Sequence, residues 1–188
     1  LSNSQIAFLC DRRKGIGADG LMLLGNEKGF DFSMTYYNAD GTQSFCGNGA
    51  RCAVAFAAAL GKLKSANTSF MAIDGLHEAV ICQDEVKLKM SDVQPIQMRG
   101  QDFELNTGSP HYICLDNDHS SAHVAQLGKQ IRYNDTYKEQ GINVNLMSLL
   151  EDGLRVATYE RGVEAETLSC GTGVTAAALV YAQLQNIS

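Results

Sequence analysis

The hydrophobic residues of this chain fall into short alternating runs and two longer apolar runs. Short stretches in which aromatic or aliphatic residues alternate with polar ones, separated by glycine-rich turns, are typical of β-strands. In the first half they predict strands at 5–10, 21–24, 30–37, 68–73, 77–82 and 85–90. In the second half they predict strands at 102–106, 111–116, 142–150 and 154–160, with an amphipathic helix over 120–130. The pattern therefore indicates a mixed α/β protein.

The two longer runs are rich in alanine, and each follows a cysteine and a glycine turn. They read "SFCGNGARCAVAFAAALG" at 44–61 and "LSCGTGVTAAALVYAQ" at 168–183. We expect a helix from Gly49 to Leu60, apolar almost all round and therefore enclosed by other elements, and a second helix from Gly173. The two Cys-Gly-x-Gly copies are 124 residues apart. So short a match can arise by chance, but the shared flanking pattern favours an internal duplication.

A polar stretch, "SDVQPIQMRGQD", lies between the two copies and contains one of the two prolines of the chain. Such stretches often connect domains. We therefore predict an N-terminal lobe at 1–94 and a C-terminal lobe at 95–188, each with one Cys-Gly-x-Gly helix. We also expect both ends of the chain to be incomplete.

Charge and composition limit the classes of partner. Acidic residues outnumber basic ones by 21 to 15, for a formal charge of −6, so the chain lacks the basic surface that nucleic acid requires. No apolar run approaches the ~20 residues that span a bilayer, so no membrane partner is expected. A chain of this length does not need its six cysteines as a disulfide framework, which favours reduced thiols and a cytoplasmic location.

Cys46 and Cys170 stand where the two apolar helices are expected to begin. Unpaired backbone amides and the helix dipole favour the thiolate form of a cysteine there, and glycines leave those amides open to a carboxylate or phosphate. Two matched thiols suggest a pair that acts on opposite faces of one carbon, removing a proton on one side and returning one on the other. The alternative is that both are inert buried residues or form a disulfide.

The motifs "YYNADGTQSFCGNGARC", "GSPHYI" and "YERGVEAETLSCGTG" resemble those of the diaminopimelate epimerase family, over nearly the whole chain. The resemblance implies an α/β (α+β) fold of two pseudo-symmetric lobes, each a mixed or antiparallel sheet wrapped around a central helix. It implies epimerisation of LL-2,6-diaminopimelate to the meso form without cofactor or metal, in lysine and peptidoglycan-precursor biosynthesis. It further implies a small amino-acid substrate, a cytoplasmic location and a possible homodimer.

The resemblance also implies residue roles. Cys170 would accept the proton and Cys46 would donate one, with the roles exchanged in reverse, while His111 and Glu160 would lie near the thiols and complete the catalytic set. The residues expected to contact substrate are Asn38, Gly47, Asn48, Ser109, Asn143, Glu160, Arg161, Gly171 and Thr172.

Some of these residues also have a structural interpretation. Asn38 in "YNADG" suits a plain turn, Glu160 and Arg161 could be an exposed charge pair, and an isolated histidine such as His111 is more often structural. Ser109 stands where many family members carry asparagine, and the family's opening Gly-Asn-Asp-Phe segment is absent. The other cysteines are predicted to be core residues: Cys10, Cys52, Cys82 and Cys114.

Two other functions compete with the epimerase. A proline or hydroxyproline racemase would use the same pair of cysteines, but "YNADG" and "YERG" favour the epimerase. A non-catalytic relative that only binds a ligand would not need both thiols.

Overall fold

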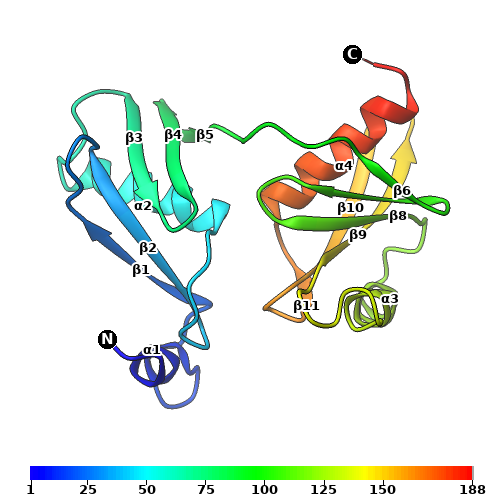
Figure 1. Cartoon of the computed structure of the whole chain (residues 1–188), viewed down its shortest axis with the longest axis horizontal. Helices are drawn as coiled ribbons and strands as arrows, with labels where there is room; N and C mark the ends of the chain where they lie inside the picture. Colours follow the sequence, from blue (N-terminus) through cyan, green and yellow to red (C-terminus); the bar gives the residue numbers. More distant parts are fainter. Residues whose placement is uncertain (188) are drawn as a thin grey trace. The chain divides into compact units, whose positions relative to one another are not determined.

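The structure is a computed structural model that describes residues 1–187, and it divides into two units (Figure 1). Unit 1 is Leu1–Lys89, and unit 2 begins at Met90. The predicted boundary between residues 94 and 95 falls five residues later, and the assignment of two lobes with those limits stays a prediction. Each unit contains one β-sheet and at least one packed helix, so the predicted mixed α/β class is confirmed.

Unit 1 is a five-stranded sheet with two helices. Its strands lie in the order β1-β2-β3-β4-β5, and all neighbours are antiparallel except β2 and β3, which α2 connects as a crossover. Its elements, in chain order, are α1 (Asn3–Cys10), β1 (Gly20–Gly25), β2 (Phe32–Asn38), α2 (Gly47–Ala59), β3 (Asn67–Ala72), β4 (Gly75–Cys82) and β5 (Glu85–Leu88).

The first predicted strand, at 5–10, is wrong, because these residues form helix α1. Ser2 and Gln5 make a capping box. The main-chain amide of Gln5 donates to Ser2 Oγ over 3.3 Å, and the main-chain amide of Ser2 donates to Gln5 Oε1 over 2.8 Å. Reciprocal bonds of this kind satisfy two amides that a helix start leaves unpaired. The signature Ser-x-x-Gln was therefore present in the sequence and outweighs the β-propensity of the short apolar run.

Helix α2 packs one side against the sheet of unit 1. Ala50, Val54 and Ala57 meet Phe32 and Phe70, whose rings stack with centroids 4.8 Å apart. Burying each phenylalanine contributes roughly 2–3 kcal/mol.

The expectation that α2 is enclosed on all sides is wrong for the described residues. Its other side is open, with Phe56 53% and Leu60 52% exposed and Cys52 exposed beside them. An apolar sequence therefore does not by itself show how many sides of a helix are covered.

The part of unit 2 that the structure describes is a six-stranded sheet with strand order β11-β10-β9-β8-β7-β6 and two helices. Among these strands only β8 and β9 run parallel, and helix α3 connects them. Its elements are β6 (Gln97–Arg99), β7 (Asp102–Asn106), β8 (Pro110–Leu115), α3 (Ser121–Arg132), β9 (Asn143–Leu150), β10 (Gly153–Glu160), β11 (Ala165–Thr167) and α4 (Gly171–Leu184).

The sheet of unit 2 has an apolar cluster on each side. On one side Val144 and Leu146 of β9 pack with Val124 of α3, and on the other Met147 packs with Ala176 and Val180 of α4. Side chains alternate between the faces of a strand, so Asn143 and Asn145 share the α4 face with Met147. This register brings polar side chains of a buried strand toward the start of α4.

The remaining sequence predictions have mixed outcomes. The strands predicted after residue 20 and both later helices are confirmed, with α4 beginning two residues before Gly173. The three-residue strands β6 and β11 are too short to carry a periodicity. Cys10 and Cys114 are buried as predicted, whereas Cys52 and Cys82 are exposed, because they lie on the outward faces of α2 and β4.

Candidate active site

Cys46 is the N-cap residue of α2. Its backbone is extended, with φ −131° and ψ 111°, and its carbonyl accepts the first helical bond from Ala50 N over 2.7 Å. Its half-buried Sγ accepts from the amide of Gly49 over 3.4 Å. The sulfur therefore lies beside the main-chain donors at the start of α2.

The two glycines after Cys46 have different surroundings. A Cβ on Gly47 would have Arg51 Nη1 at 3.8 Å and Leu88 Cδ2 at 4.0 Å as its nearest neighbours, so the backbone there is open to approach. A Cβ on Gly49 would lie 3.2 Å from the Tyr36 ring, closer than ordinary contact. The first glycine therefore leaves the helix start accessible, and the second allows tight packing.

Asn38 ends β2 and shapes the turn that leads to Cys46. Its side-chain Nδ2 donates to Thr42 Oγ1 over 3.0 Å, and its Oδ1 accepts from Ser44 Oγ over 3.1 Å. Gly41, with φ 86°, completes the turn. Asn38 thus has the local turn role expected for this motif, while Asn48 lies exposed in the first turn of α2.

Cys170 is the N-cap residue of α4 and repeats the geometry of Cys46. Its φ is also −131°, with ψ 97°, and Val174 N donates to its carbonyl over 2.9 Å. The residue is only 8% exposed, and its Sγ lies 3.6 Å from Thr172 Oγ1. The two copies of the motif therefore share a backbone conformation, but a main-chain amide lies beside the sulfur of Cys46 and a side-chain hydroxyl beside that of Cys170.

His111 lies within hydrogen-bonding distance of the start of α4. Its Nε2 is 2.9 Å from Thr172 Oγ1, and its Nδ1 is 3.0 Å from Asn145 Nδ2. The residue is fully buried, and burial, with a smaller contribution from the positive charge of Arg161, lowers the pKa of His111 to about 4. The imidazole is therefore neutral at pH 7.

A second polar chain joins the ends of β8, β9 and β10. Asn143 Nδ2 donates to Ser109 Oγ over 2.8 Å and to Pro110 O over 3.0 Å. Asn143 Oδ1 accepts from the amide of Arg161 over 2.9 Å. Glu160 ends β10 opposite Ala165 of β11.

The predicted site residues thus form two groups, one in each unit. Unit 1 holds Asn38, Cys46, Gly47 and Asn48, and unit 2 holds the rest. In unit 2, direct hydrogen bonds connect His111, Thr172 and Cys170 in one network, and Ser109, Asn143 and Arg161 in a second network.

Three buried residues of unit 2 escaped the sequence prediction. Thr107 Oγ1 donates to Thr172 O over 2.8 Å, and Thr158 Oγ1 donates to Asn145 Oδ1 over 2.8 Å. The available signal was "NVN", two asparagines on the same face of an apolar strand. Buried amides need partners, so such a pair indicates a polar network.

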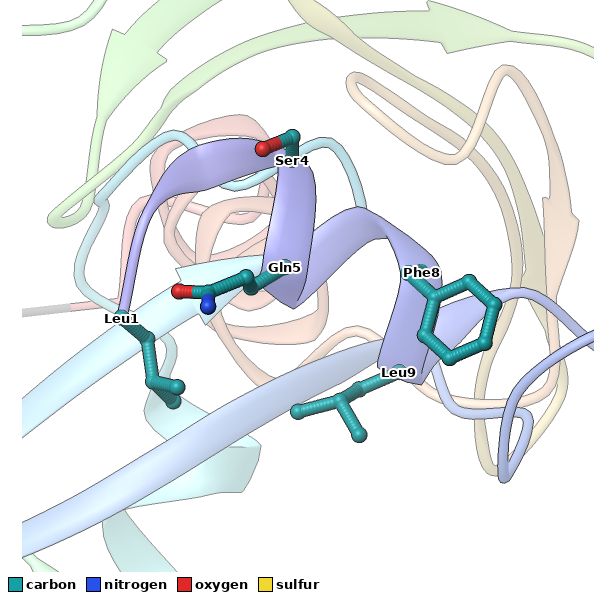
Figure 2. Close-up of a pocket in the computed structure, with 5 residues that line it drawn as sticks. All are labelled: Leu1, Ser4, Gln5, Phe8 and Leu9. Carbon is teal, nitrogen blue, oxygen red and sulfur yellow. The ribbon is translucent and has the colours of Figure 1, made fainter.

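A separate pocket of about 340 Å³ lies along α1 (Figure 2). Leu1, Ser4, Gln5, Phe8 and Leu9 line it, and none is a predicted site residue. Within residues 1–187 there is no group of three or more His, Cys, Asp or Glu side chains placed to share a metal ion. No helix of the same residues is long and apolar enough to cross a membrane.

Solved structures show which known fold the chain has. A phenazine biosynthesis protein of the PhzF family from Bacillus anthracis matches with a TM-score of 0.68 and 11% identity, over 97% of this chain and 70% of its own. A hydroxyproline epimerase from Agrobacterium vitis matches with a TM-score of 0.64 and 16% identity, over 98% and 66%. The chain therefore has the fold that these two proteins share.

Sequence relatives identify the family of the chain. The sequence model described as "Diaminopimelate epimerase" matches residues 1–96 and 103–188. A diaminopimelate epimerase from Flavobacterium psychrophilum is 49% identical over 93% of this chain and 69% of its own length, and one from Chlorobaculum tepidum is 41% identical over 100% and 77%. The chain belongs to the diaminopimelate epimerase family, and it is an enzyme of the isomerase class.

Proposed function

We propose that this chain epimerises LL-2,6-diaminopimelate to meso-diaminopimelate by a two-base mechanism that uses no cofactor. The observation that carries the proposal is the pair of cysteines with matching N-cap geometry, one at the start of α2 and one at the start of α4. The name of the relatives supplies the substrate. The product would serve lysine and peptidoglycan-precursor biosynthesis.

In one direction the Cys170 thiolate takes the α-proton, and the electron pair of the C–H bond stays on the substrate as a carbanion. The Cys46 thiol then gives its proton to the opposite face of that carbon, so the configuration inverts and the two sulfurs exchange protonation states. The reverse reaction uses the same steps with the roles exchanged. No net oxidation or loss of atoms occurs.

The carbanion requires stabilisation, because no electron sink is bound. We infer that main-chain amides at the two helix starts, in the Gly47-Asn48 and Gly171-Thr172 turns, donate to the α-carboxylate, where negative charge grows. The absence of close neighbours around a Cβ at Gly47 supports this approach of substrate.

The remaining residues are assigned to substrate binding or proton control. Asn38 and Asn143 contact the substrate with Ser109, while Glu160 and Arg161 bind the substrate's amino and carboxylate groups. The neutral imidazole of His111 and the Glu160 carboxylate influence which sulfur holds the proton. Because Asn143 already bonds Ser109 and the Arg161 amide, its side chain is held in place before substrate arrives.

Assembly and location belong to the same proposal. We infer a cytoplasmic enzyme that acts as a homodimer, from the expected reduced thiols and from the family resemblance. Analytical ultracentrifugation of the purified protein tests the dimer.

The test of activity is proton exchange in D₂O. LL-diaminopimelate is incubated with the protein and a thiol reductant, without added cofactor, and the α-hydrogen signal is followed by NMR. Loss of that signal with appearance of the meso isomer supports the proposal. Exchange on proline or hydroxyproline instead would transfer the assignment to a racemase, and no exchange on any of these would favour a binding protein.

A further inference from the structure

Asn145 is a fully buried amide whose hydrogen-bonding groups are used on both sides. Its Nδ2 lies 3.2 Å from Tyr112 O and 3.0 Å from His111 Nδ1, and its Oδ1 lies 2.8 Å from Thr158 Oγ1. The residue lies in the middle of β9, directly opposite Thr158 of β10. Nothing in the proposed reaction requires Asn145 to touch substrate.

The partners of Asn145 determine how its amide is oriented. A backbone carbonyl can only accept, so the group that faces Tyr112 O must be the NH₂. The hydroxyl of Thr158 then donates to the remaining Oδ1. With this orientation, the second hydrogen of the NH₂ points at the ring of His111.

This orientation of Asn145 in turn selects the tautomer of His111. Because Nδ1 receives a hydrogen bond from Asn145, it must carry a lone pair, and the proton of the neutral ring is on Nε2. With the other tautomer, two donors would face each other across 3.0 Å. The Nε2 proton is directed at Thr172 Oγ1, 2.9 Å away.

The hydrogen bond from His111 determines where the Thr172 hydroxyl can donate. Its oxygen accepts from His111, which leaves its single proton available for Cys170 Sγ at 3.6 Å. A hydrogen bond donated to sulfur stabilises the thiolate over the thiol. The successive hydrogen bonds therefore all donate in the same direction, from Thr158 through Asn145, His111 and Thr172 to the sulfur of Cys170.

We propose that Asn145, held by Thr158, is a positioning residue that fixes the Nε2–H tautomer of His111 and thereby directs the Thr172 hydroxyl proton to Cys170. Its importance for turnover rests on the proposed function, in which Cys170 must form a thiolate. The tautomer itself does not depend on that function.

The first test reads the tautomer directly. The protein is labelled with ¹⁵N-histidine, and long-range ¹H–¹⁵N correlation spectra are recorded at neutral pH under reducing conditions, with His111 assigned by its loss in His111→Gln. The expected spectrum shows a protonated Nε2 and an unprotonated Nδ1. In Asn145→Asp the new carboxylate accepts from Nδ1, so that nitrogen becomes protonated. A protonated Nδ1 in the unaltered protein, or an unchanged spectrum in Asn145→Asp, overturns the proposal.

The second test measures turnover. Thr158→Val removes the donor that holds the amide and should lower kcat about 10-fold with little change in KM. Asn145→Asp should lower kcat about 10- to 100-fold, the size typical when a residue that orients a metal-bound histidine is replaced. Thr158→Ser keeps a hydroxyl and should restore activity. Ser148→Ala, also buried on β9 but on the opposite face, is the matched control.

The two tests separate this proposal from the proposed function. If the unaltered protein does not epimerise diaminopimelate, the proposed function fails, but the tautomer experiment still decides the role of Asn145. If Thr158→Val folds, shows the Nδ1–H tautomer and keeps full activity, the link from Asn145 to Cys170 is refuted. If Asn145→Asp does not fold, Thr158→Val and the unaltered protein still give both answers.

Discussion

Replacing Gly173 by alanine should destabilise the protein and disturb the polar chain around His111. An ideal Cβ at Gly173 would lie 2.3 Å from Asn145 Oδ1 and 3.2 Å from Cys170 Sγ. Real Cβ atoms essentially never come closer than 3.0 Å to another heavy atom, so either Asn145 or the start of α4 must move. Asn145 is fully buried and held by His111 and Thr158, so it has no free direction in which to withdraw.

The cost follows from these contacts. Overpacking of a tight interior typically costs about 1–3 kcal/mol, and the better helix propensity of alanine returns at most about 1 kcal/mol. The expected loss in free energy of unfolding is therefore roughly 1–2 kcal/mol, or a fall in Tm of about 2–8 °C for a chain of this size. Turnover should fall as well, because the displaced amide no longer orients His111.

The assay combines urea unfolding, followed by circular dichroism, with the NMR epimerase assay. Gly47→Ala is the matched control for stability, because its Cβ would meet nothing closer than 3.8 Å, and its unfolding free energy should stay unchanged or rise by at most about 1 kcal/mol. Its activity should nevertheless fall, since the methyl group occupies the approach to the helix start. If Gly173→Ala unfolds at the same urea concentration as the unaltered protein and keeps its activity, the packing argument is refuted.

Three further predictions concern titratable and reactive groups. Cys46→Ala and Cys170→Ala should each lower kcat at least about 10²-fold, the usual contribution of a general acid or base. Cys52→Ala, on the exposed side of α2, should leave kcat unchanged, and a fully active Cys46→Ala would contradict the two-base mechanism. His111 has a folded pKa of about 4, below its ordinary value, so its contribution to stability is present above pH 6.5 and is lost as the pH falls toward 4, by about 3 kcal/mol. Urea unfolding at pH 7 and pH 4.5 measures most of this loss, and His111→Gln should show less of it. Burial, with the negative charges of Asp102 and Asp116, raises the pKa of Cys114 to about 12, so iodoacetamide at pH 8 should modify the exposed Cys52 and Cys82 before Cys114, as peptide mass spectrometry would show.

Much of the fold could be predicted because hydrophobic alternation reports local geometry. The eight-residue strands β9, which buries its first six residues in succession, and β10, which is mostly half-buried, give a clear apolar pattern, whereas β6 and β11, with three residues each, give none. The apolar content of residues 5–10 predicts a strand, but the capping pair of Ser2 and Gln5 favours the helix α1 that the structure has. Burial of α2 could not be predicted because covering a helix requires elements from elsewhere in the chain.

The candidate site was predictable only where a motif carried it. Cys46 and Cys170 stand out because each precedes glycines and an apolar helix. Asn145 and Thr158 have no such context: they meet only through pairing of β9 with β10, and their relation to His111 depends on the parallel pairing of β8 with β9. Contacts across a sheet are set by register, which a single sequence does not specify.

The sulfurs of Cys46 and Cys170 differ in the kind of hydrogen-bonding group beside them. This difference affects how easily a substitution can alter the surroundings of each sulfur. The donor to Cys46 is the main-chain amide of Gly49, which every residue except proline retains. The hydroxyl beside Cys170 belongs to the side chain of Thr172, and the groups behind it are side chains too, so single substitutions can weaken or reverse it. Adjustment of proton affinity by mutation, in evolution or in the laboratory, is therefore far more accessible at the second thiol, while the first is protected by the backbone itself.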